Sequence, residues 1–380
     1  MAAFGFSLAL LGTLFGFPEM RERLQVDVMR QGAMSSLLIA GIWVSTVIVG
    51  PLIDRFGNKV VLAVSSFLVS AAFLSFAVAD SFALAAAAAL LLGFGGGGLN
   101  TSTNVVVSEL YDENRGSMLN LLGIFFGAGA VMVPLVAARM SPNAAIIFAA
   151  GFAFLCGVLY VVLPFPAPTE AHSFSLREAL KVVTYPGVLL FSFILFFESA
   201  NEQAMNTFTS TWLGGLGAST RIATLGLVGY QLAMAVGRII AAPLLTVVSK
   251  RKVVMASAIG SVISVVALFS AHAVVASIVA VVASGLSFAA IYPTVLGIAG
   301  DRYQKFAGTV FGALFAIALL GGVAAPSAVG FIGQRFGLQY GKIVVVIGAA
   351  MLTVLVIAMV RSERGRTGFA REKELAATSK

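Results

Sequence analysis

The chain has 380 residues, of which 59% are hydrophobic and 11% are charged, and its mean hydropathy is +1.00. A soluble globular domain carries about 25% charged residues, so this composition excludes a soluble domain and predicts a protein surrounded mostly by lipid. The net charge of +8 does not indicate nucleic-acid binding, because the basic residues lie in the gaps between apolar runs, as membrane topology requires.

Long apolar runs follow one another along the chain, and a spanning helix needs about 20 such residues. The pattern predicts an all-α membrane protein with twelve transmembrane helices. The first run is short and lacks an N-terminal flank. The repeat described below places the start of this helix before residue 1, so we expect the chain to begin inside its first helix. The predicted spans are 1–17, 33–54, 59–79, 82–108, 116–138, 143–165, 184–213, 222–248, 253–271, 273–299, 308–333 and 339–360.

The longest polar connection, residues 166–183, separates the first six runs from the last six. We therefore predict an N-terminal six-helix bundle over 1–165 and a C-terminal six-helix bundle over 184–360. The polar segment over 361–380 is expected to be a mobile tail.

The distribution of Lys and Arg predicts the orientation. Sixteen of them lie on the side of the predicted termini and seven on the other side. Loops rich in Lys and Arg stay in the cytoplasm. We therefore expect a multi-pass protein of the cell inner membrane with both termini, and the 166–183 connection, in the cytoplasm.

The two halves repeat each other. They align without gaps at an offset of 192 residues, which places Pro51 on Pro243, Glu109 on Asp301 and Gly129 on Gly321. Repeated halves are typical of secondary transporters, whose substrate site lies between the repeats near the middle of the membrane.

The turn between the second and third spans reads GPLIDRFGNK over residues 50–59. It resembles the major facilitator signature G-x-L-x-D-R-x-G-x-[K/R], in which Gly57 permits a tight turn. Because twelve spans, a central connection and a half-length repeat accompany it, the resemblance covers the whole chain. It implies two pseudo-symmetric six-helix halves.

The same resemblance implies a gating latch. Asp54 would cap a helix of the opposite half, and Arg55 would pair with an acid at the end of span four, for which Glu109 is the candidate. The second copy of the motif is degraded, so an equivalent latch there would use Arg238 and Asp301. The alternative is that all of these are ordinary topology charges.

Spans five and seven are similar to those of the fucose–proton symporter family of sugar carriers. The similarity rests on residues 120–129, on Pro134–Leu135, on Glu202 and on Trp212–Leu213. The GPxxGG sequence of the drug antiporters is absent from span five. However, spans one and four hold no carboxylate, so the acid-based coupling of the fucose carriers does not transfer by position.

Glu198 and Glu202 are the carboxylates placed well inside a predicted span. They are four residues apart and therefore share a helix face. A charged carboxylate in the membrane costs ~2.5–3.5 kcal/mol, so such residues usually face a functional site. Their repulsion and burial favour a proton on at least one, which predicts proton coupling; sodium is the competing ion. The alternative is that one of them lies near the outer surface.

Uncharged amides and aromatic rings on several spans predict the substrate site. Amides bond hydroxyl groups and rings stack on the apolar face of a sugar, whereas the alternative is hydrogen bonding between helices. The candidate substrate-binding residues are Trp43, Asn100, Asn104, Glu202, Asn206, Gln231 and Tyr292.

These features predict a monomeric transporter that takes up a sugar or a similar neutral polar solute, coupled to protons or sodium. The alternative is a proton-coupled exporter of an amphipathic small molecule. No sequence motif of an enzyme occurs, and the single cysteine, Cys156, offers no thiol metal site. We therefore expect neither enzymatic activity nor a cofactor or metal ion.

Overall fold

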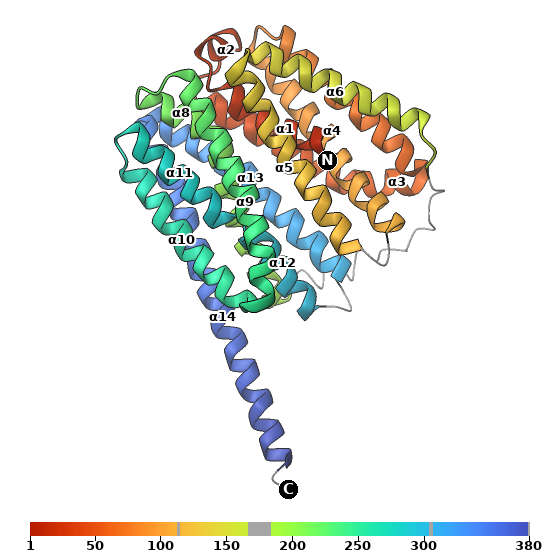
Figure 1. Ribbon diagram of the computed structural model, residues 1–380, viewed down its shortest axis with the longest axis vertical. Helices are drawn as coiled ribbons and strands as arrows, with labels where there is room; N and C mark the ends of the chain where they lie inside the picture. Colours follow the sequence, from red (N-terminus) through yellow and green to blue (C-terminus); the bar gives the residue numbers. More distant parts are fainter. Residues whose placement is uncertain (112–114, 166–183, 304–306, 379–380) are drawn as a thin grey trace.

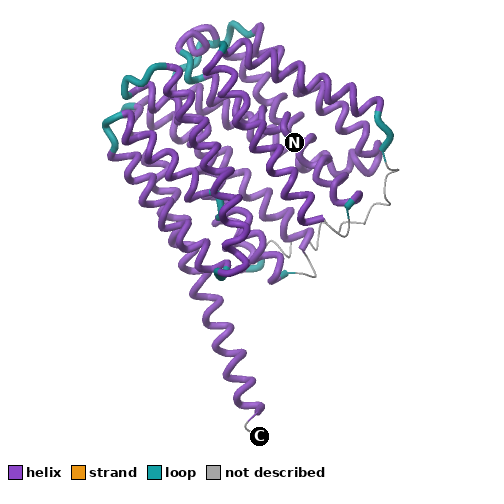
Figure 2. Tube along the Cα trace, viewed as in Figure 1, coloured by secondary structure: helices purple, strands orange, loops and turns teal. Residues whose placement is uncertain are grey.

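The computed structural model describes residues 1–111, 115–165, 184–303 and 307–378, and these residues form helices joined by short turns (Figure 2). The connection over 166–183 lies outside the described residues. In the first half the helices are α1 (Ala2–Leu14), α2 (Pro18–Arg23), α3 (Val28–Val78), α4 (Phe82–Leu110), α5 (Arg115–Arg139) and α6 (Pro142–Val162). In the second half they are α8 (Pro186–Gly215), α9 (Thr220–Val247), α10 (Lys250–Ser270), α11 (Val274–Phe288), α12 (Ile291–Arg302), α13 (Ala307–Phe336), the 3-10 turn η2 (Leu338–Lys342) and α14 (Ile343–Thr378).

The described residues contain nine helical segments long and apolar enough to cross a membrane. One of them, α3, has 51 residues and changes direction at Gly57, where φ is 78°. Glycine adopts this left-handed conformation without steric cost, so α3 supplies two spans. With the short α1 and the polar α8, the total is twelve, and the predicted all-α membrane fold is confirmed.

Two predicted elements differ from the structure. The span expected over 273–299 is divided, because α11 ends at Phe288 and α12 begins at Ile291. Pro293 lacks an N–H group and its ring would clash with the carbonyl of Ala289 in a continuous helix. The tail expected to be mobile instead continues α14 as a helix to Thr378, which projects beyond the bundle (Figure 1).

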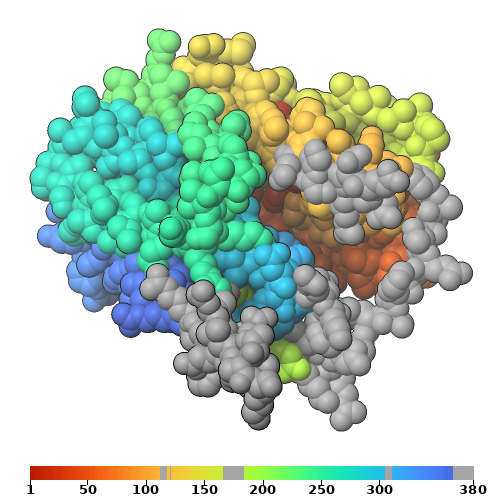
Figure 3. Space-filling view, turned by 60° about the horizontal axis from the view of Figure 1, so that its bottom comes forward, coloured from red at the N-terminus to blue at the C-terminus, as the bar shows by residue number. Residues whose placement is uncertain are grey.

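Successive helices run up and down, so the bundle has two ends. We call the end that carries the turn at Gly57 the motif end, and the end that carries α2 the α2 end. In Figure 1 the α2 end is uppermost. Figure 3 turns the lower face toward the viewer and shows the two halves as separate blocks, red to yellow beside green to blue.

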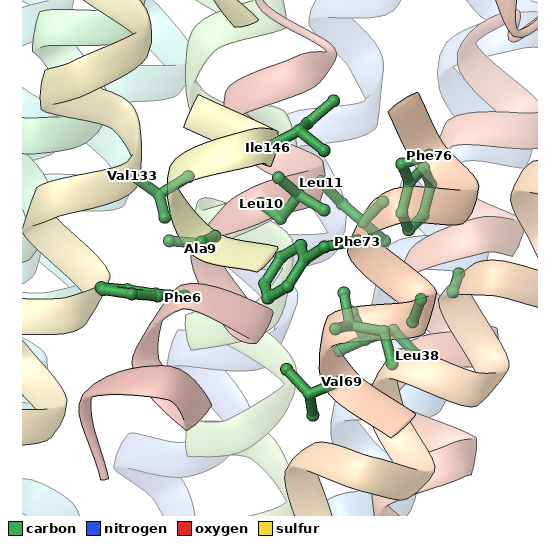
Figure 4. Close-up of a cluster of buried hydrophobic side chains, with 14 of the residues drawn as sticks. Phe6, Ala9, Leu10, Leu11, Leu38, Val69, Phe73, Phe76, Val133 and Ile146 are labelled. Carbon is green, nitrogen blue, oxygen red and sulfur yellow. The ribbon is translucent and has the colours of Figure 1, made fainter. Parts of the chain in front are cut away.

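Each half has its own apolar core. In the first half, Phe6 and Leu10 of α1 pack with Phe73 of α3, Val133 of α5 and Ile146 of α6 (Figure 4). A second cluster joins α8 through α14 in the other half. These cores hold the helices of each half together, whereas the polar residues described next lie mainly on α8 and where the halves meet.

Candidate functional site

Helix α8 carries more buried polar side chains than any other helix in the described part of the molecule. It packs against α13, α9, α14 and α1, so it is enclosed on several sides. Side chains that face these neighbours are removed from lipid and from water. The buried polar residues of α8 are Ser192, Glu198, Ser199, Asn201, Asn206, Thr207, Thr209, Ser210 and Thr211.

The two carboxylates of α8 lie in the interior. Glu198 is 1% exposed, and neither of its carboxylate oxygens has a hydrogen-bond partner. Glu202 is half-buried one turn further along. The hydroxyl groups of Tyr230 and Tyr292 and the Arg238 guanidinium lie within electrostatic range of both carboxylates. The reading that places one glutamate near the surface does not hold for Glu198.

Four of the candidate amide residues form two hydrogen-bonded pairs. Gln231 Nε2 of α9 donates to Asn206 Oδ1 of α8 at 2.7 Å, and both residues are buried. On α4, Asn104 Nδ2 donates to the Asn100 carbonyl at 2.8 Å and to Asn100 Oδ1 at 3.1 Å. The structure thus brings two of the candidate residues together in each half, and the contacts it describes do not join one pair to the other.

The predicted aromatic residues, Trp43 and Tyr292, both contact α13. The Tyr292 ring stacks on Phe315, with centroids 6.1 Å apart and planes 18° from parallel. Trp43 Nε1 of α3 donates to the Ala316 carbonyl of α13 at 3.1 Å. The indole N–H of Trp43 is therefore used for helix contact, as in the alternative reading of these residues.

Polar contacts that the sequence reasoning missed join the halves at the α2 end. Gln31 of α3 is 1% exposed, and its Nε2 donates to the Thr207 carbonyl and to Thr211 Oγ1 of α8, each at 2.8 Å. Thr211 Oγ1 also lies 3.1 Å from Gln31 Oε1. Ser36 Oγ lies 2.5 Å from the Val323 carbonyl of α13. A single glutamine just before a predicted span resembles a loop residue, so no sequence signal pointed to this contact.

Along α3, the two halves are in contact at the α2 end and separate toward the motif end. At Gly32 of α3, an added Cβ atom would overlap the Pro326 carbonyl of α13. Gly50 lies 18 residues further on, which returns to the same face of an α-helix. At Gly50 an added Cβ atom would meet nothing within 4 Å. One face of α3 therefore closes against the second half at the α2 end and is open near the motif end.

Two acids of the predicted latch, Glu109 and Asp301, make contacts within their own half. Asn58 Nδ2 donates to Glu109 Oε2 at 3.3 Å, and Lys250 Nζ lies 2.6 Å from Asp301 Oδ2. These two pairs occupy equivalent positions in the repeat. The pairing expected between Arg238 and Asp301 is not made, because Arg238 lies nine residues before the end of α9, about 13 Å from the motif end.

The remaining latch residues lie at the surface of the motif end. Asp54 and Arg55 are exposed, and the Arg55 guanidinium lies over the ring of Phe56, 5.1 Å from its centroid. Among the described residues, no group of three or more His, Cys, Asp or Glu side chains is placed to hold a metal ion. The interior polar groups described above are carboxylates, amides, phenols and one guanidinium.

Comparison with known sequences agrees with this arrangement. A sequence profile described as the Major Facilitator Superfamily matches residues 1–226 and again residues 191–379. The chain belongs to the Major Facilitator Superfamily. The repeated match reflects the two related halves. The resemblance noted at residues 50–59 is therefore confirmed for the superfamily. The chain is thus a membrane transporter of this superfamily.

Solved structures share the fold of this superfamily member. A mutant form of the nucleoside transporter NupG aligns with a TM-score of 0.77 over 95% of this chain and 97% of its own, at 16% identity. A bacterial homolog of the human lysosomal transporter Spinster, inward-facing and unoccupied, aligns with a TM-score of 0.82 over 95% and 94%, at 10% identity. These identities show a common fold only.

One curated relative is an uncharacterized MFS-type transporter, YfiU, of Bacillus subtilis (strain 168). It is 34% identical over 100 residues, which is 26% of this chain. The match spans 19% of the length of that relative. This similarity supports the superfamily.

Proposed function

We propose that this protein takes up a sugar or a similar neutral polar solute across the cell inner membrane by alternating access, coupled to protons. The observation that carries the proposal is Glu198. Its carboxylate is buried in a spanning helix without a hydrogen-bond donor, and carboxylates in this setting usually serve transport or proton relay. Glu198 and Glu202 are the proposed coupling pair, with sodium as the competing ion.

The proposed substrate class follows from the uncharged candidate residues of the two halves. The Asn206–Gln231 pair, the Tyr292 ring and, on the other half, Asn100 and Asn104 offer donors, acceptors and a stacking face. These groups suit hydroxyl-rich solutes. The sugar-carrier resemblance of spans five and seven supports this class, and nucleosides, which carry a sugar, belong in the same screen.

The proposed orientation places the motif end and both termini in the cytoplasm, with the protein working as a monomer. The excess of Lys and Arg on the motif side supports this topology. Under it, closure at the α2 end and separation at Gly50 correspond to a carrier open toward the cytoplasm. Asp54, Arg55 and Glu109 would then act when the motif end closes, which is the latch that the signature implies.

Two experiments test the proposed function. A thermal-shift screen of the purified protein against sugars and nucleosides identifies the substrate, because a bound ligand raises the apparent stability by mass action. Transport by Glu198→Gln and Glu202→Gln in proteoliposomes then tests coupling. Each variant should exchange substrate across the membrane yet fail to accumulate it. Uphill accumulation by both variants at the wild-type level would refute the coupling role.

A further inference from the structure

Arg238 is a charge within a spanning helix, and it does not make the contact with Asp301 that a latch in the second half would use. Asp301, its expected partner, is paired with Lys250 at 2.6 Å. The Nε atom of Arg238 is buried and has no hydrogen-bond partner in the structure. A cation within a membrane-spanning segment is costly and rarely lacks a function. A partner for the charge of Arg238 is therefore to be sought among the interior side chains of the second half.

The contact between α8 and α9 fixes the position of Arg238 along the axis of the bundle. The two helices run in opposite directions, and the 2.7 Å bond from Gln231 to Asn206 sets their register. Measured from that bond toward the motif end at about 1.5 Å per residue, Glu202 lies about 6 Å away, Arg238 about 10 Å and Glu198 about 12 Å. Arg238 follows Gln231 by seven residues, which returns to nearly the same helix face. It therefore lies at the level of the two carboxylates and on the side of α9 that faces α8.

The neighbouring elements supply few other ionisable groups. Tyr230 of α9 and Tyr292 of α12 interact electrostatically with the carboxylates. Between residues 310 and 330 of α13 and between 343 and 360 of α14 there is no Asp, Glu, Lys, Arg or His, and α1 and α11 contain none. Two carboxyl groups and one permanently charged guanidinium thus dominate the charge of this site.

We propose that Arg238 is the counter-charge of Glu198 and Glu202, so that the site is neutral when the pair holds one proton, and that the carrier moves one proton per transport cycle. This inference rests on the proposed proton coupling. Without a proton the three groups carry one net negative charge, and with two protons they carry one net positive charge. Because net charge is disfavoured when the site is closed to water, the substrate-loaded carrier closes in the singly protonated form. The proton then leaves with the substrate on the other side, and the empty carrier returns without it, slowly because its site is charged. Arg238 is a positioning residue for charge, not a substrate contact.

The accumulation of substrate in proteoliposomes at a fixed membrane potential measures the number of protons. One coupled proton gives about tenfold accumulation per pH unit of gradient, and two give about a hundredfold. We expect about tenfold for the wild type and for Arg238→Lys, and about a hundredfold, with an optimum at lower pH, for Arg238→Gln. The double variant Arg238→Gln with Glu202→Gln should return to about tenfold, whereas Glu202→Gln alone should not accumulate substrate.

The two proposals fail in different ways. If the wild type shows no accumulation driven by a pH gradient, the proposed proton coupling itself is wrong. If the wild type accumulates about tenfold but Arg238→Gln retains that same value, the counter-charge role is refuted. Should Arg238→Gln fail to fold, the double variant still tests the inference: recovery of folding and of tenfold coupling supports it, and a folded but uncoupled double variant overturns it.

Discussion

Replacing Gln31 by Leu should open the α2 end of the carrier. The amide of Gln31 makes the hydrogen bonds to Thr207 and Thr211 that tie α3 to α8 across the halves. Leucine has a similar volume and no polar atoms, so the variant removes these bonds with little change in packing. The states in which the α2 end is open do not contain these bonds and should lose nothing.

The size of the effect follows from the number of bonds. Three hydrogen bonds are lost, and side-chain hydrogen bonds in membrane bundles are worth about 0.6 kcal/mol each on average. The closed state should therefore be destabilised by about 2 kcal/mol, which shifts the equilibrium by roughly thirtyfold. The fraction of molecules with an open α2 end should rise by roughly 5- to 30-fold. The lower value applies if this fraction is already large in the wild type, because it cannot exceed one.

A cysteine buried in the closed α2 end reports this population. Ser210 is 1% exposed, and its Cβ is 3.0 Å from the position of a Cβ added at Gly16, just after α1. In a Cys156→Ser background, Ser210→Cys should react with a membrane-impermeant maleimide only when this end opens.

The matched control is Gln334→Leu, since Gln334 is an exposed glutamine near the same end of the bundle. Labelling should accelerate in Gln31→Leu and stay at the wild-type rate in Gln334→Leu. Equal labelling rates in the two variants would refute the assignment of Gln31 to closure.

Three further outcomes are expected. Gly32→Ala should also accelerate maleimide labelling, because its Cβ would overlap the Pro326 carbonyl between the halves; an unchanged rate would contradict this. Gly93→Ala, whose Cβ would overlap backbone within the first half, should lower the midpoint of thermal unfolding without accelerating labelling. Lys250→Met should change that midpoint by only about 2–4 °C, because the pair with Asp301 is largely exposed and such pairs are worth at most ~1 kcal/mol; a larger loss would show that the pair is structurally essential.

The fold could be predicted because apolar length and turn chemistry are local properties. Each span follows from about 20 apolar residues, and the turn at Gly57 follows from a glycine where φ must be positive. The break before Pro293 was also encoded locally. Hydropathy alone concealed it, since the residues on both sides of the break are apolar.

The contacts between helices could be predicted only in part. Glu198 and Glu202 were identifiable because carboxylates in an apolar run are rare. Arg238 was assigned to the motif end by analogy with the first half, whereas its register against α8 depends on how two helices pack. The role of Gln31 depends on the position of Thr207, which lies 176 residues away in the chain. Such pairings follow from tertiary packing and not from the local sequence.

Proton movement on addition of substrate is the measurement that tests the central claim most directly. Purified protein in proteoliposomes, with no imposed gradient and with the membrane potential clamped, is mixed with a sugar or nucleoside that binds in the thermal screen, while a pH electrode follows the external medium. Proton-coupled uptake predicts a substrate-dependent alkalinisation that a protonophore abolishes and that Glu198→Gln lacks. An acidification would instead indicate proton-coupled export, and substrate uptake with no pH change in the wild type would contradict proton coupling.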